Sequence, residues 1–204
     1  MHCAAPQDGP PRPGALRRGR RLAVFVLALA VLLALIGGAP PVRAAEPELT
    51  SFELVHNDDG LFLSYAVDIE LSRSVDDALS KAVPLFFVAE AELFRNRFYW
   101  RDQRVGYAVR RWRIVFQPLT STYRVTFDGG LSQNYASRAE AFAAIGRSGR
   151  WKIAEGPQIE AGSRHYVEFS FRLDTSQLPR PMQIGIGGQA DWAMSVQRTQ
   201  KINP

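Results

Sequence analysis

The clearest structural signal in this chain is the stretch LFLSYAVDIEL at residues 61–71. Apolar side chains occupy every second position of it, and they are Leu61, Leu63, Tyr65, Val67, Ile69 and Leu71. Because successive side chains of a strand point to opposite faces, this period of two predicts a β-strand with one buried face.

The residues before this stretch repeat the pattern. Phe52 and Leu54 alternate with polar neighbours, and the sequence NDDG at residues 57–60 separates the two stretches. Asn and Asp tolerate left-handed backbone geometry and Gly carries no Cβ, so these four residues favour a turn. The sequence therefore predicts a β-hairpin that begins near residue 49.

Further stretches with the pattern of strands follow along the chain, and the one that begins at Leu85 is at first apolar on both faces, as a buried central strand is. We predict strands at residues 85–94, 104–116, 123–127, 151–154, 165–173, 182–186 and 192–198. Two short helices are expected, one capped by Ser74 and ended by Pro84, the other capped by Ser137 with Glu140 and ended by Gly146. Strands joined mostly by turns indicate a mainly β fold, an antiparallel β-sandwich of the immunoglobulin-like or a similar type. A curled sheet or an open barrel is the alternative.

The first 44 residues differ in kind from the rest. A basic region with five arginines precedes an apolar run at residues 22–36, a Gly/Pro breaker and the sequence VRA, which ends at Ala44. This three-part pattern is typical of a secretion signal, and we predict cleavage after Ala44. The run of 15 apolar residues is shorter than the ~20 of a bilayer span, although an uncleaved membrane anchor is the alternative.

The predicted organisation is therefore a signal peptide or anchor at residues 1–44 and a single β-rich domain at residues 45–204. We expect the domain in the periplasm or on the extracytoplasmic face of the inner membrane.

Six of the 25 basic but only one of the 20 acidic residues lie before residue 45, so the β domain carries no formal net charge. Nucleic-acid-binding domains are normally basic, so we expect no nucleic-acid partner. The only cysteine, Cys3, also precedes the domain, which excludes disulfides and thiolate metal sites within it.

Three groups of motifs occur in order along the domain. They are AELFR (91–95) with FYWRD (98–102), GGLSQ (129–133) before Ser137, and RLDTSQLP (172–179) before Asp191-Trp192. With the leader, they resemble a family of small exported proteobacterial proteins known only as a domain of unknown function. The resemblance covers nearly all of residues 48–196 and implies no activity or catalytic residues. It implies a link to envelope signalling, since the family's genes often lie beside a membrane sensor kinase of the nitrogen-regulation type.

No combination of residues predicts catalysis. His56 and His165 do not belong to a His-x-His or His-Glu-x-x-His motif, and zinc usually needs three or four ligands in close array. The sequence GRSG at residues 146–149 is one residue short of a nucleophile elbow. Glu90 and Glu92 are expected on the outer face of a strand. We therefore expect no catalytic residues, no cofactor and no metal site.

Residues 95–113 are unusual because they contain seven arginines and a single acid, Asp102, interleaved with aromatic residues. Arg, Tyr and Trp are enriched at protein-binding hot spots, and Arg also binds carboxylate and phosphate groups bidentately. The candidate interaction surface is formed by Arg97, Tyr99, Trp100, Arg101 and Arg104. The alternative is an ordinary strand–loop–strand unit in which arginine stems cover exposed sheet and Trp112 lies in the core.

These observations favour a non-enzymatic exported envelope protein that acts as a protein-interaction module, with a membrane sensor kinase as its candidate partner. A binding module for an anionic envelope lipid or glycan is the first alternative. An unrecognised hydrolase is the second.

Overall fold

The structure, a computed structural model, describes residues 47–99, 101–128, 130–160, 162–180 and 190–202. The predicted leader with its cleavage site at Ala44, the candidate residue Trp100 and the strand predicted at residues 182–186 lie outside the described residues. Among the helices of the described part, none has the length and apolar character needed to span a membrane.

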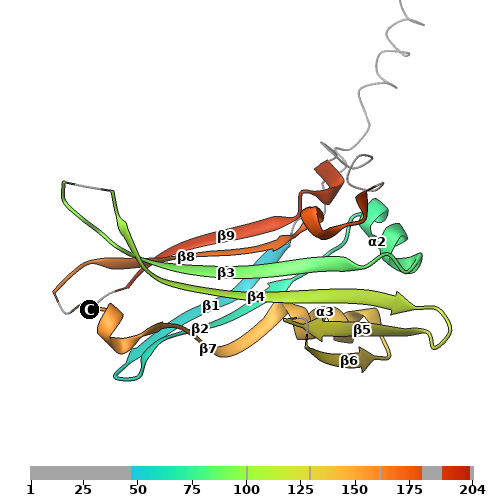
Figure 1. Cartoon of the computed structure of the whole chain (residues 1–204), viewed down its shortest axis with the longest axis horizontal. Helices are drawn as coiled ribbons and strands as arrows, with labels where there is room; N and C mark the ends of the chain where they lie inside the picture. The colour runs from blue at the N-terminus through green and yellow to red at the C-terminus, as the bar shows by residue number, and fades with distance from the viewer. Residues whose placement is uncertain (1–46, 100, 129, 161, 181–189, 203–204) are drawn as a thin grey trace, which may run out of the picture. The chain divides into compact units, whose positions relative to one another are not determined.

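The described residues are mainly β, with strands arranged in two antiparallel sheets (Figure 1). This confirms the predicted fold class at that level. The smaller sheet has the strand order β1 (Glu48–Asn57), β2 (Gly60–Asp68), β7 (Arg147–Glu155). The larger sheet has the order β6 (Leu131–Tyr135), β5 (Thr122–Phe127), β4 (Gln103–Gln117), β3 (Leu85–Arg95), β8 (His165–Leu173), β9 (Ser195–Ile202).

Two α-helices and three short 3₁₀ turns connect the described strands. The α-helices are α2 (Arg73–Ser80) and α3 (Arg138–Gly146), and the 3₁₀ turns are η1 (Gly156–Gln158), η2 (Thr175–Gln177) and η3 (Ala190–Trp192). α3 leads directly into β7 and packs against β2, β5 and β6. It therefore contacts both the smaller sheet and the β5–β6 end of the larger sheet, and cavities lie on both sides of it.

One hydrophobic core joins the two sheets. Leu63 and Tyr65 of β2 and Phe87 and Phe169 of the larger sheet are all buried in it. The Tyr65 and Phe169 rings lie 4.7 Å apart between their centroids, and Phe52 of β1 lies 5.5 Å from the Phe169 ring. Each fully buried large apolar side chain contributes roughly 1.5–3 kcal/mol relative to exposure, so these alternating faces hold the sheets together.

The predicted hairpin is present. Asn57 pairs with Gly60 across the turn, and β1 and β2 pair along their length. Gly60 has φ +139°, and a Cβ there would lie 2.2 Å from the Ala154 carbonyl oxygen of β7, so only glycine fits. β2 ends at Asp68, three residues earlier than the alternation predicts.

The predicted N-cap residue is confirmed for one helix and wrong for the other. Ser137 caps α3, accepting a hydrogen bond from the Glu140 N–H at 3.2 Å, and α3 ends at Gly146 as predicted. The cap of α2 is Ser72, which accepts from the Val75 N–H at 3.3 Å, so the prediction of Ser74 was wrong. The Ser74 hydroxyl instead donates to Asp191 at 3.0 Å.

Other differences concern weakly patterned strands. β6 was not predicted because its sequence LSQNY is mostly exposed and polar. β7 begins at Arg147 instead of residue 151, and β9 runs from Ser195 to Ile202, after the 3₁₀ turn η3. Pairing with β2 extends β7 back to Arg147, pairing with β8 extends β9 to Ile202, and pairing with β5 forms β6.

Candidate interaction surface

The loop between β3 and β4 carries most of the candidate surface. The two strands form a long antiparallel hairpin with one register shift, where Leu93 pairs with Gly106 and Phe94 with Arg104. Val105 is therefore an extra residue on β4, and such bulges bend a strand and increase its twist. The loop lies at the end of the sheet away from α2 and α3 (Figure 1).

Two aromatic side chains project from this loop. Phe98 is 84% exposed and Tyr99 is 85% exposed, and their rings meet edge to face with centroids 4.6 Å apart. Phe98 is one of the aromatic residues interleaved with the arginines, but it was not predicted as part of the candidate surface. The structure makes it equivalent to Tyr99 in exposure, so the apolar part of the surface is a pair of rings.

Hydrogen bonds hold the base of the loop. The Asp102 carboxylate accepts from the Arg97 N–H at 3.1 Å and from the Tyr166 hydroxyl of β8 at 2.9 Å. Burial, followed by the hydrogen bond to Asp102, raises the pKa of Tyr166 to about 12. The Asn96 N–H also donates to the Arg164 carbonyl at 2.8 Å. The loop is therefore tied to the chain that precedes and forms β8.

The arginines near the loop differ in how their charges are balanced. Arg95 forms an ion pair with Glu160 at 2.5 Å, and Arg104 forms one with Glu92 at 2.5 Å. The Arg97 guanidinium bonds the neutral side chain of Gln103, and Arg101 is exposed. Within the described residues, neither Arg97 nor Arg101 forms an ion pair. The free positive charge of the loop therefore comes from these two residues.

Arg104 continues a row of charged side chains on the outer face of the larger sheet. Its guanidinium lies 5.3 Å from the centroid of the Tyr107 ring. Further along, Arg172 of β8 binds both carboxylate oxygens of Glu90 on β3, at 2.6 and 3.2 Å. This hydrogen bonding is the main reason why the pKa of the Glu90 carboxyl lies below its usual range. Glu90 and Glu92 thus balance arginines of neighbouring strands.

A match to one family model covers this region and the rest of the domain. The model of the domain of unknown function DUF4390 matches residues 44–202. The chain belongs to the DUF4390 family. This confirms the resemblance to a family of unknown function that the motifs indicated. No curated protein and no solved structure matches the chain.

One arginine of the DUF4390 domain points in the opposite direction from its neighbours. Arg111 and Arg113 are exposed, whereas Arg110 is half-buried on the same face of β4 as the buried Trp112. Its guanidinium lies 5.0 Å from the Trp151 ring centroid and donates to the Ser148 hydroxyl. Desolvation lowers the pKa of Arg110. The period of two along β4 contains this signal, since Arg110 and Trp112 are two positions apart and so share a face, although the seven arginines were predicted as one group.

The histidines lie apart in the DUF4390 domain. His56 is exposed on β1, and His165 is buried at the start of β8, where its Nδ1 lies 3.1 Å from the Ser163 carbonyl oxygen. Across the described ranges, no three His, Cys, Asp or Glu side chains are grouped as metal ligands would be.

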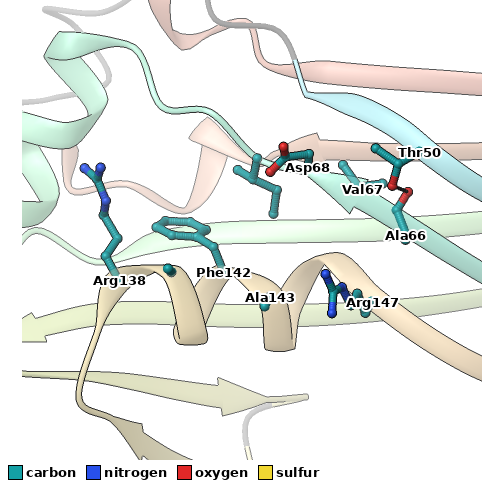
Figure 2. A pocket seen from close by; sticks show the side chains of 10 residues that line it. Thr50, Ala66, Val67, Asp68, Arg138, Phe142, Ala143 and Arg147 are labelled. Carbon is teal, nitrogen blue, oxygen red and sulfur yellow. Dashed lines mark hydrogen bonds between the residues drawn. The ribbon is translucent and has the colours of Figure 1, made fainter.

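A cavity of about 500 Å³ opens between α3 and the ends of β1 and β2 (Figure 2). Figure 2 shows the Phe142 ring between Arg138 at one end of the helix and Arg147 at the other, with Asp68 across from them. The Thr50 hydroxyl donates to the Ala66 carbonyl at 3.1 Å, and Arg138 pairs with Asp76 of α2. The positive and negative groups of this cavity are thus largely balanced.

Proposed function

We propose that this DUF4390 protein is a non-enzymatic exported envelope protein that binds a protein partner through its β3–β4 loop. The observation that carries the proposal is the exposed ring pair of Phe98 and Tyr99 on a loop whose base is hydrogen bonded. Aromatic residues beside arginine are the typical anchors of protein interfaces. Because Asp102 and Tyr166 already order the loop, binding would cost less conformational entropy than it would for a free loop.

The charges of the loop favour a protein over an anionic lipid or glycan. Arg95 and Arg104 are neutralised by Glu160 and Glu92, which leaves Arg97 and Arg101 beside the rings. Binding to anionic membranes gains about 1 kcal/mol for each basic residue near the surface, so two free arginines give little affinity. They are better suited to the acidic rim of an apolar pocket on a partner protein.

The leader and the family resemblance supply the rest of the proposal. The signal-peptide pattern of residues 1–44 supports export, with the domain in the periplasm or on the extracytoplasmic face of the inner membrane. The resemblance supports the extracytoplasmic part of a membrane sensor kinase as the partner.

We also propose that the two sheets form a sandwich. The shared core of β2 and β8 side chains supports this over an open barrel. An immunoglobulin constant-type sandwich pairs four strands with three, whereas the sheets here have six and three strands. We therefore favour a sandwich that is similar to the immunoglobulin type but does not belong to it.

Crosslinking in cells tests the interaction. A photoreactive phenylalanine analogue is placed at position 98 or 99, and as a matched control at Leu119, which is fully exposed in the loop after β4. We expect one protein to be crosslinked from positions 98 and 99 but not from 119. In the variant with the probe at 98, Tyr99→Ser should lower the yield, while the free energy of unfolding changes by less than about 0.5 kcal/mol because the ring is exposed.

Two outcomes would contradict the proposal. Identical products from positions 98 and 119 would mean that the loop has no specific partner. Products that contain lipid or glycan instead of protein would favour the anionic-envelope alternative.

A further inference from the structure

A second cavity lies on the other side of α3 and is not part of the β3–β4 loop. It has a volume of about 560 Å³ and is lined by residues of α3 and of the strands β4, β5 and β6, with Arg147 at the start of β7. Aromatic side chains form much of its wall, namely Trp112, Phe127 and Tyr135. Its size is that of small-molecule sites in proteins, which span roughly 300–1,000 Å³, and Ser132 and Gln133 add polar groups to the lining.

Two cations border this cavity. Arg110 reaches it from β4 and Arg147 from the junction of α3 and β7. The lining contains no Asp or Glu. Within the described residues, neither guanidinium has an ion-pair partner, although Asp128 acts on Arg110 electrostatically. The cavity therefore combines aromatic side chains with two guanidinium groups that have no ion-pair partner within the described residues.

The groups that contact the Arg110 guanidinium are aromatic rings and a neutral hydroxyl. Its guanidinium is half-buried against the rings of Phe127 and Trp151, at 5.8 and 5.0 Å from their centroids, and its hydrogen-bond partner is the neutral Ser148 hydroxyl. Removing a cation from water without supplying an anion is costly, so half-buried arginines are normally paired or bind a ligand. A ligand with an anionic group would supply the missing charge.

The cavity of Figure 2 provides a comparison within the same molecule. It also borders α3 and shares Arg147, but it contains the Asp68 carboxylate, and its Arg138 is already paired with Asp76. An anion gains less there because acidic groups are present. Of these two cavities, only the one against β5 and β6 has arginines but no carboxylate in its lining.

We propose that the cavity between α3 and β4–β6 binds a small amphipathic carboxylate, a molecule with one carboxylate group and an apolar acyl or aryl body. The carboxylate lies between Arg110 and Arg147, because guanidinium N–H groups match carboxylate oxygens in geometry and charge. The apolar body lies against Trp112, Phe127 and Tyr135. Leu131, which lines the cavity and is 80% exposed, would be partly covered by it.

Isothermal titration calorimetry on the purified full-length protein tests this proposal. The probes are dodecanoate, which has an acyl body, and 2-naphthoate, which has an aryl body. The controls are 1-dodecanol, dodecyltrimethylammonium and acetate. We expect one site that is saturated below the critical micelle concentration by at least one of the two carboxylate probes. Comparing these probes distinguishes the acyl from the aryl ligand.

Variants locate the site. Arg147→Gln should weaken binding of the carboxylate by about tenfold or more, because a hydrogen-bonded ion pair is lost. Arg147 is exposed and has no ion-pair partner in the described structure, so this variant should still fold. Ala144→Phe narrows the cavity and should abolish binding with both arginines intact. Arg138→Gln, at the other end of α3, is the matched control and should leave the affinity unchanged.

Three outcomes would overturn the proposal. They are the absence of saturable binding by both carboxylates, equal affinity for dodecanol and dodecanoate, and an affinity that is unchanged in both Arg147→Gln and Ala144→Phe. None of these outcomes tests the β3–β4 loop. The proposal for the cavity and the proposal for the protein-binding loop can therefore be contradicted independently of each other.

Discussion

Arg110 on β4 donates a hydrogen bond to the Ser148 hydroxyl on β7 and thereby links the two sheets. The bond joins residues 38 positions apart and lies beside the Trp151 ring, over which the guanidinium packs. Both partners are shielded from water, since Ser148 is 7% exposed and Arg110 is half-buried. A polar contact therefore contributes to the packing of the two sheets, which otherwise rests on apolar side chains.

Removing this hydroxyl should destabilise the domain. We expect Ser148→Ala to lower the free energy of unfolding by about 1–2 kcal/mol, because the half-buried guanidinium loses its hydrogen-bond acceptor. Urea unfolding followed by tryptophan fluorescence measures the change. Ser51→Ala, at an exposed serine of β1, is the control and should change stability by less than about 0.5 kcal/mol. Equal effects of the two variants would contradict a role for the Arg110–Ser148 bond.

The Glu90–Arg172 pair should make stability depend on pH. The pKa of Glu90 is lower in the folded protein than its ordinary value of 4.5, mainly because of the hydrogen bond from Arg172. The pair therefore stabilises the fold above pH 4.5, and its contribution disappears as the pH falls through the lower folded-state pKa. Because both side chains are partly exposed, the contribution is at most about 1 kcal/mol.

We expect Glu90→Gln to be less stable than the parent protein at pH 7 and to match it more closely at pH 3. Urea midpoints at a series of pH values measure the difference. Glu53→Gln on β1 is the control, since that carboxylate has no ion pair in the described part of the chain. A gap between Glu90→Gln and the parent that stays constant from pH 7 to pH 3 would rule out this linkage.

Gly146, at the end of α3, should not tolerate a side chain. A Cβ at this position would lie 2.3 Å from the Val67 carbonyl oxygen of β2, so backbone atoms would have to move. We expect Gly146→Ala to cost about 2–3 kcal/mol, as overpacking of a core does. Gly149→Ala is the matched control three residues later, where nothing lies within 4 Å of the added Cβ. Thermal unfolding of both variants should show a large decrease in Tm for the first only.

The two serines at the start of α2 should differ in importance. Ser72→Ala should cost about 1 kcal/mol, because the Val75 N–H loses its capping oxygen in a buried setting. Ser74→Ala removes an exposed hydrogen bond to Asp191 and the contact with the Ser72 hydroxyl, but it leaves the capping oxygen in place and should cost less. Chemical denaturation of both variants decides the order. A larger loss for Ser74→Ala would favour the cap that the sequence pattern indicated.

The secondary structure was largely predictable where a local rule governs it. The strands β2, β4 and β8 follow the period of two, β3 follows it from Ala89 onward, and the Ser137 cap of α3 is encoded within three residues. β6 could not be predicted, because its residues from Leu131 to Tyr135 pair with β5 but are not buried on an alternating face. Ser72 was missed because the local pattern favours Ser74, which has an acid three residues later at Asp77, whereas the burial of Ser72 is a tertiary property.

The candidate surface was predictable only in its composition. The cluster of arginines and aromatic residues is visible in the sequence, and so is the loop that contains Arg97, Tyr99 and Arg101. Which arginines remain unpaired depends on Glu92 and Glu160, and Glu160 is supplied by a distant part of the chain. The cavity beside α3 was not anticipated at all, because its walls come from β4, β5, β6 and the helix.

The sequence by itself thus determined the alternating strands, their turns and the class of the fold, because alternation and turn preference are properties of neighbouring residues. Only the tertiary structure decided how charge is distributed over the domain. Ion pairs and hydrogen bonds join residues that are distant along the chain, such as Glu90 and Arg172, which are 82 positions apart. They neutralise some arginines and leave Arg97, Arg101, Arg110 and Arg147 without an acidic partner within the described residues.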